Sequence, residues 1–120
     1  MQNINIKNVS KMERLRLEIV AFLFTEEVYG DVTIYCEGKR YIYDYNGKCK
    51  VENADVRDYL EYCNPETLSM AFEGTLYELF NFYHPAKYCN EIIDEFNAII
   101  GKYGLYYEQG NAWNLSLYEV

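Results

Sequence analysis

DVTIYCEGKRYIYDYNGKCKVE, residues 31–52, decides the fold because three short strand-like runs are separated there by two turn signals. Asn46-Gly47 is the stronger signal, since both residues tolerate the positive φ that a two-residue type I′ turn requires. This turn would pair Tyr45 with Lys48 and continue outward along both strands. The stretch therefore predicts a three-stranded antiparallel meander.

The predicted register places tyrosines and lysines on one face, because side chains alternate along a strand. This candidate partner-binding face comprises Tyr35, Tyr41, Tyr43, Tyr45, Lys48 and Lys50. Tyr35 belongs to it if residues 36–38 form a three-residue loop, which sends Val32 and Ile34 to the opposite face. A two-residue loop at Glu37-Gly38 would instead place these aliphatic side chains under the tyrosines.

The rest of the chain predicts helices and strands around this meander. Ser10 and Glu13 form a capping box that begins a helix ending before Gly30. The apolar stripe on this helix is predicted to be widened by Leu17, Val20 and Phe24. The later predicted elements are a short helix over 55–63, a strand over 67–73 with a helical alternative, a helix over 75–83, a helix from Pro85 to about 101, and a hairpin of 105–108 and 112–118 turning at 109–111.

These elements give the order α-βββ-α-β-α-α-ββ, an α+β domain with a mostly antiparallel sheet. A chain of 120 residues is long enough for one hydrophobic core, so we expect a single domain over residues 1–120 with residues 1–9 flexible. The 14 tyrosines outnumber the six phenylalanines. Many of these rings must expose or hydrogen-bond their hydroxyl groups, and tyrosine is enriched at interfaces.

The formal charge of −8 is concentrated in the second half, where residues 51–120 carry 12 acidic and three basic side chains. Such a chain is repelled by nucleic acid and anionic membranes and attracted to basic partners, although solubility alone would also explain its charge. Two acidic rows recur at helical spacing without a neighbouring lysine. These candidate partner-binding rows are Asp55, Asp58 and Glu61, and Glu91, Asp94 and Glu95.

Enzyme and cofactor motifs are not found in the sequence. There is no phosphate loop, serine elbow or HExxH motif, and the four cysteines include no CxxC pair, so we predict no cofactor and no metal. His84 and Cys89 lie five residues apart and are a formally available nucleophile pair, but a histidine beside a proline is more often a cap or a surface residue. No signal peptide or membrane span is predicted, which favours a cytoplasmic protein with reduced thiols.

A short, acidic, aromatic-rich chain without catalytic motifs is similar in type to phage-encoded inhibitors of bacterial nucleases and CRISPR effectors, with no motif in common. The resemblance implies stoichiometric binding to a basic, nucleic-acid-binding protein partner, with the acidic rows occupying its groove as a nucleic-acid mimic. One alternative is binding of single-stranded nucleic acid or a small ligand through the Tyr/Lys face. A second alternative is an enzyme that uses Cys89 and His84.

Overall fold

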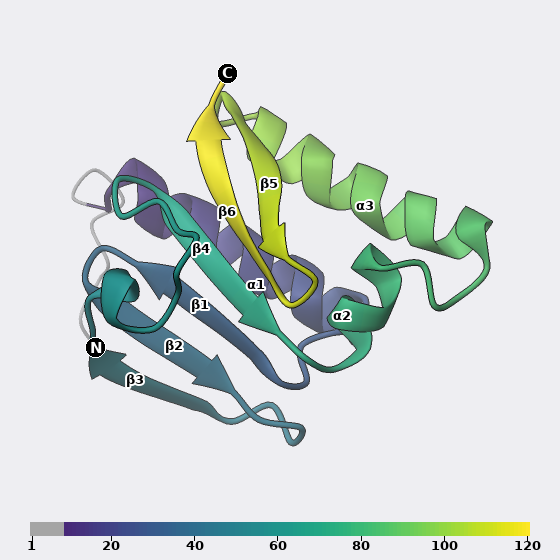
Figure 1. The fold of residues 1–120 in the computed structure, drawn as a ribbon, viewed down its shortest axis with the longest axis horizontal. Helices are drawn as coiled ribbons and strands as arrows, with labels where there is room; N and C mark the ends of the chain where they lie inside the picture. The colour runs from purple at the N-terminus through teal and green to yellow at the C-terminus, as the bar shows by residue number, and fades with distance from the viewer. Residues whose placement is uncertain (1–8) are drawn as a thin grey trace, which may run out of the picture.

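A six-stranded antiparallel sheet in the order β3-β2-β1-β4-β6-β5 forms the centre of the computed structural model, which describes residues 9–120 (Figure 1). Three helices accompany it, so the α+β class is confirmed. The elements are α1 (Lys11–Thr25), β1 (Val32–Cys36), β2 (Lys39–Tyr43), β3 (Cys49–Asn53), a 3-10 turn (Val56–Asp58), β4 (Leu68–Phe72), α2 (Thr75–Phe80), α3 (Ala86–Gly101), β5 (Leu105–Asn111) and β6 (Asn114–Glu119). The expected flexibility of residues 1–8 falls outside the described residues.

The helices α1 and α3 pack on one face of the sheet, and the segment 54–67 crosses the other, which we call the open face (Figure 1). Successive side chains of β1 point to opposite faces of the sheet. Ile34 is buried in the main core with the helices, whereas Tyr35 packs with Val56 and Leu60 in a smaller cluster. The sheet therefore lies between the side chains of α3 and those of the segment 54–67.

The apolar stripes of α1 and α3 form the helical side of the main core. Its fully buried members include Leu15, Ile19, Leu23, Ile92, Phe96 and Ile100. Burying one such side chain stabilises the fold by about 1.5–3 kcal/mol. The predicted widening of the α1 stripe is confirmed for Val20, which packs against the main core, and is wrong for Leu17 and Phe24, which are 51% and 40% exposed.

The helix α1 begins as predicted but ends earlier. The Oγ of Ser10 accepts the backbone N–H of Glu13 at 3.0 Å, while the Glu13 carboxylate pairs with Arg16, so only half of the capping box forms. Glu27 adopts a left-handed φ of 57°, and the N–H of Val28 bonds to the carbonyl of Leu23. These contacts end the helix at Thr25, several residues before Gly30.

The first meander turn is the two-residue alternative. Cys36 pairs with Lys39, and both Glu37 and Gly38 have positive φ, as a type I′ turn requires. Ile34 therefore lies opposite Tyr41 and on the same face, together with the helices. The three-residue loop that would have placed Tyr35 beside the other tyrosines is wrong.

The second turn, by contrast, is longer than the predicted two residues. Tyr43 pairs with Cys49, and the Oδ1 of Asp44 accepts the N–H groups of Asn46 and Lys48, each at 2.9 Å. The side chain of Asp44 therefore organises a five-residue loop over residues 44–48. The one-residue change in register puts Lys50 on the face opposite Tyr43.

The predicted helix over 55–63 is wrong, because only the 3-10 turn Val56–Asp58 forms there. Leu60 turns onto the open face of the sheet, where it packs with Tyr35. The Nδ2 of Asn114, at the start of β6, donates to the backbone carbonyl of Tyr62 at 2.8 Å, so this carbonyl bonds to the sheet and not within a helix. Packing against the sheet thus takes precedence over the helical spacing, and three helices replace the predicted four.

The later elements follow the predicted order with shifted ends. The strand predicted over 67–73 is confirmed as β4, Leu68–Phe72, against the helical alternative. The helix α2 stops at Phe80, and Pro85 is the N-cap of α3 instead of its first residue. The final hairpin turns at residues 112–113, beyond the predicted 109–111, because a bulge falls between Gln109 and Asn111. No helix within residues 9–120 is long and apolar enough to cross a bilayer.

Candidate functional site

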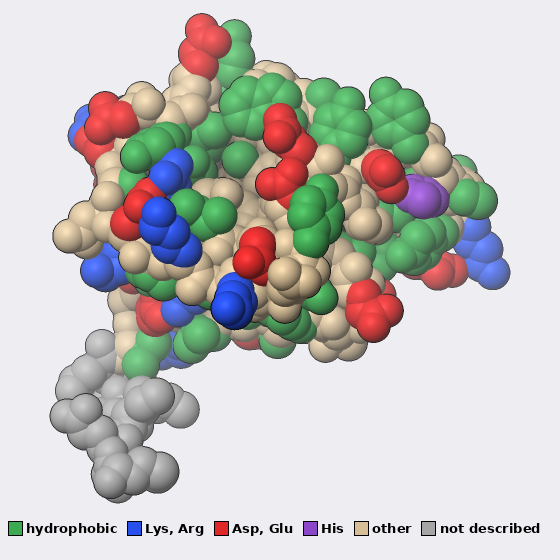
Figure 2. Space-filling view, turned by 90° about the horizontal axis from the view of Figure 1, so that it is seen from below, with side chains coloured by type: hydrophobic (Ala, Val, Ile, Leu, Met, Phe, Trp, Pro, Cys, Tyr) green, Lys and Arg blue, Asp and Glu red, His purple; other side chains and the backbone are tan. Residues whose placement is uncertain are grey.

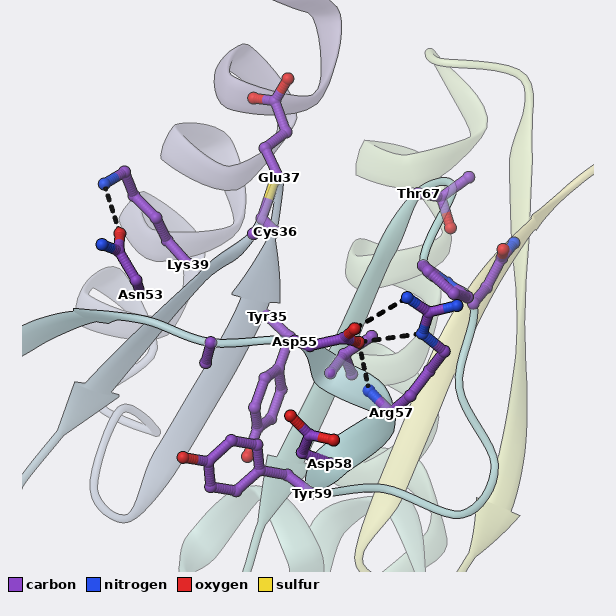
Figure 3. Close-up of a pocket in the computed structure, with 15 residues that line it drawn as sticks. Tyr35, Cys36, Glu37, Lys39, Asn53, Asp55, Arg57, Asp58, Tyr59 and Thr67 are labelled. Carbon is purple, nitrogen blue, oxygen red and sulfur yellow. Dashed lines mark hydrogen bonds and ion pairs between the residues drawn. The ribbon is translucent and has the colours of Figure 1, made fainter.

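A hollow of about 650 Å³ lies on the open face, between the β1–β2 turn, the end of β3 and the segment 54–67 (Figure 3). Its wall includes the predicted acidic residues Asp55 and Asp58, together with Glu37, Lys39 and Arg57. The hollow brings together residues that lie far apart in the sequence. It is therefore a candidate surface for polar contacts.

Most of the charge in this hollow is already neutralised. Arg57 donates three hydrogen bonds to the Asp55 carboxylate, from its backbone N–H at 2.9 Å, from Nε at 3.0 Å and from Nη2 at 2.7 Å. The guanidinium, followed by the backbone N–H of Arg57, lowers the pKa of Asp55 to about 2. Within residues 9–120, Glu37 and Asp58 lie outside ion-pair distance of every basic side chain. The hollow is left weakly anionic.

Aromatic rings form the wall beside Asp58. The rings of Tyr35 and Tyr59 lie 5.7 Å apart, and Cζ of Arg40 lies 4.1 Å from the Tyr59 centroid. Burial is the main cause that raises the pKa of Tyr35. Arg40 also pairs with Glu52 on the neighbouring strand. Figure 3 shows Tyr35, Asp58 and Tyr59 below the Asp55–Arg57 pair.

The six residues of the predicted Tyr/Lys face do not share a face. Tyr41 and Tyr43 lie on the helical side, where the guanidinium of Arg16 covers the Tyr41 ring at 3.9 Å. Tyr35 and Lys50 lie on the open side, and Tyr45 and Lys48 are exposed in the loop 44–48. Because of the two register changes, this predicted constellation does not form.

The two predicted acidic rows lie on opposite faces of the sheet. Asp55, Asp58 and Glu61 belong to the segment 54–67 on the open face and share no helix edge. The second row lies exposed on α3, on the helical side, and comprises Glu91, Asp94 and Glu95. The rows therefore do not merge into one surface.

The sequence analysis missed a fourth carboxylate that joins the α3 row. Burial and the charge of Glu26, at the C-cap of α1, raise the pKa of Glu95. We call Glu26, Glu91, Asp94 and Glu95 the α3 acidic face. In the sequence, the acidic pair Glu26-Glu27 at the end of the first helical pattern was the feature that pointed to Glu26. That Glu26 lies close to Glu95 follows only from the packing of α1 on α3.

The Cys89 and His84 side chains do not form a nucleophile–base pair in this geometry. The Cys89 thiol is fully buried and donates to the backbone carbonyl of His84 at 3.4 Å. The His84 Nε2 lies 2.9 Å from a carboxylate oxygen of Glu78. A buried thiol offers no surface to a substrate, so this arrangement does not support covalent catalysis.

Metal-ligating side chains do not gather in the part of the chain that the structure describes: residues 9–120 contain no group of three or more His, Cys, Asp or Glu side chains able to hold an ion. The four cysteines, Cys36, Cys49, Cys63 and Cys89, are all free thiols. Comparison with protein-family models, curated proteins and solved structures finds no match to this chain.

Proposed function

We propose that this protein acts by stoichiometric binding to a basic protein partner through the α3 acidic face. One observation carries the proposal. Only five of the nineteen acidic side chains lie within ion-pair distance of a Lys, Arg or His in residues 9–120, and none of the four carboxylates of this face is among them. Such a surface attracts a positively charged partner and accelerates encounter with it.

The α3 acidic face is better suited to this role than the row on the open face. Asp55 is already neutralised by Arg57, which leaves only Asp58 and Glu61. By contrast, Ile92, Phe96 and Ile100 anchor α3 in the main core and hold its carboxylates on a rigid helix. A preorganised surface loses less conformational entropy on binding than a mobile one.

The face also costs stability when no partner is bound. Glu91 and Glu95 are one turn apart, and like charges at this spacing destabilise a helix by about 0.2–0.5 kcal/mol. The raised pKa of Glu95 shows that its charged form is disfavoured in the fold. A cationic partner relieves this repulsion, so the unneutralised carboxylates contribute more to the complex than to the free protein.

The partner class that fits this face is a protein with a groove for nucleic acid. Helical spacing places successive carboxylates about 4.5–6 Å apart along the axis, while each strand of B-DNA carries one charge per about 3.4 Å. The density of negative charge is therefore comparable. An inhibitor of the phage-encoded type, which occupies the groove of a nuclease or CRISPR effector, is the function we propose.

An inhibition assay on a panel of bacterial nucleases, including RNA-guided ones, tests the proposal. We expect cleavage by at least one basic nuclease to fall in proportion to added protein and to stop at a one-to-one ratio. Raising the concentration of the nucleic-acid substrate should restore activity, because substrate and inhibitor would use the same groove. The proposal fails if no enzyme of the panel is inhibited and none forms a complex with the chain in size-exclusion chromatography.

Direct binding of single-stranded nucleic acid or a small ligand remains a prediction, although the six tyrosines and lysines predicted to carry it do not share a face. Tyr45 and Lys48 are the two members exposed together in one loop. Quenching of tyrosine fluorescence by an oligonucleotide at low salt would support this alternative. No quenching would leave protein binding as the proposal.

A further inference from the structure

We infer that the free edge of β3 pairs antiparallel with β3 of a second copy of this chain, centred on Val51. Within residues 9–120, β3 pairs only with β2, and β3 is the end strand of the sheet (Figure 1). The pairing would join two six-stranded sheets into one continuous sheet. Such strand addition uses main-chain hydrogen bonds for affinity and side-chain pairs for register.

Two hydrogen bonds just beyond the ends of β3 show which of its residues bond to β2 and which point to the free edge. The Asp44 N–H bonds to the carbonyl of Lys48, and the Ala54 N–H bonds to the carbonyl of Gly38. Hydrogen-bonded pairs alternate along an antiparallel ladder, so Lys50 and Glu52 direct their backbone groups toward β2. The backbone N–H and C=O groups of Cys49, Val51 and Asn53 consequently point to the free edge.

The outward-pointing groups suit a symmetric pairing about Val51. In that register Val51 lies opposite Val51 of the second copy, and Cys49 lies opposite its Asn53. All three outward residues would then exchange N–H and C=O bonds with the other strand. The edge thus supplies both donors and acceptors in the phase that self-pairing requires.

Side-chain charge selects this register over its neighbours. Centring on Val51 places Lys50 opposite Glu52 of the second copy, and this happens twice because of the symmetry. Centring on Lys50 would oppose two lysines, and centring on Glu52 would oppose two glutamates. Opposite charges directly across a strand pair are favourable and like charges are unfavourable. Of these three registers, only the one centred on Val51 places both Lys50 and Glu52 opposite a residue of the other charge.

The surroundings of β3 are less acidic than the rest of the protein. Residues 39–53 contain four basic and two acidic side chains, whereas the whole chain carries a net charge of −8. Figure 2 views the molecule from below Figure 1, where β3 lies, and shows basic and acidic side chains interspersed. Val51, 49% exposed, would be covered by its counterpart. A lysine on an edge strand normally discourages pairing, and Glu52 supplies its counter-charge here.

The pairing leaves the α3 acidic face free. The helix α3 packs beside β5, which lies at the opposite edge of the sheet from β3. A dimer through β3 would therefore carry one acidic face at each end. This inference stands independently of the proposed function, because it concerns a different edge and a different partner.

Sedimentation equilibrium of the full chain over a range of concentrations tests the pairing. One five-residue strand buries less than a standard interface, so the dimer should dominate only near about 1 mM. We expect Lys50→Glu to sediment as a single chain, because glutamates then oppose each other, and Glu52→Lys to do the same through opposed lysines. Mixing the two variants should restore a dimer, since every charge then meets its opposite.

A cysteine scan tests the register without relying on those charges. The variant Cys49→Ser/Val51→Cys should form an intermolecular disulfide under mild oxidation, because residues 51 would lie about 5.5 Å apart in Cα positions. The matched control Cys49→Ser/Asn53→Cys should cross-link much more slowly, since residue 53 would face residue 49. A one-chain mass at every concentration, a dimer that survives Lys50→Glu, or equal cross-linking of the two cysteine variants would each overturn the inference.

Discussion

The guanidinium of Arg40 lies over the ring of Tyr59, with 4.1 Å between Cζ and the ring centroid. This contact joins β2 to the end of the 3-10 turn, and the Tyr59 ring also lies beside Tyr35. Together with the buried side chains of Val56 and Leu60, the stack fixes the segment 54–67 on the open face.

Tyr59→Leu should lower the free energy of unfolding by about 0.5–2 kcal/mol, because it removes the aromatic face under a half-buried guanidinium. Tyr59→Phe keeps that face and should unfold within about 0.5 kcal/mol of the wild-type protein. Urea unfolding followed by circular dichroism measures both. Equal losses for the Leu and Phe variants would show that the Arg40 contact contributes nothing.

The buried hydroxyls of Ser69 and Ser116 lie 2.7 Å apart and join β4 to β6, while the Asn64 N–H also donates to Ser69. Ser69→Ala should cost about 1–3 kcal/mol, because it removes the partner of the buried Ser116 hydroxyl and of the part-buried Asn64 N–H. Adding Ser116→Ala should cost much less than the same change made alone. Strictly additive losses in urea unfolding would contradict a shared hydrogen bond.

Asp55 should titrate well below a normal aspartate, since Arg57 lowers its pKa to about 2 from an ordinary value of 3.8. A carboxyl with a lowered pKa in the folded state stabilises the fold above its unfolded pKa. That contribution should disappear as pH falls from about 4 to about 2. NMR titration of the carboxyl carbon in the wild type and in Arg57→Gln checks this. The pKa of Asp55 should rise in the variant but stay below the ordinary value, because the backbone N–H of residue 57 still donates to the carboxylate. An unchanged titration would refute the contribution of the guanidinium.

Glu95→Gln should stabilise the protein at pH 7 by about 0.2–0.5 kcal/mol, because it removes a like charge one turn from Glu91. The pKa of Glu95 is raised in the fold, so its penalty exists above that pKa and vanishes as pH falls through it. The difference between variant and wild type in urea unfolding should shrink accordingly. A variant less stable than wild type at pH 7 would show that the carboxylate is structural.

The sequence predicted the elements whose signals are local. Leu68, Met70 and Phe72 alternate and form one buried face of β4, and the Ser10 hydroxyl caps α1 as expected. The α3 stripe containing Ile92 and Phe96 is buried as its spacing predicts. Each of these depends on a period or a cap within a few residues, which sequence alone contains.

The elements that were predicted wrongly depend on contacts between distant residues. The ring of Tyr45 lies against Gly30, where an added Cβ would come within 2.8 Å of it, and this contact accompanies the longer loop that shifts the β2–β3 register. Leu60 packs on Tyr35 instead of completing a helix. The approach of Glu26 to Glu95 likewise requires α1 and α3 to be packed together. No local pattern encodes these approaches.

The most direct test of the central claim makes two triple charge reversals in this chain and measures the binding of each variant to a nuclease that the wild-type chain inhibits. Glu91→Lys/Asp94→Lys/Glu95→Lys alters the α3 acidic face, and Asp58→Lys/Glu61→Lys/Glu108→Lys makes the same change in net charge on exposed carboxylates elsewhere. Isothermal titration calorimetry should show affinity at least about 100-fold weaker for the first variant and within about tenfold of wild type for the second. Equal losses, or a larger loss for the second variant, would contradict binding through the α3 acidic face.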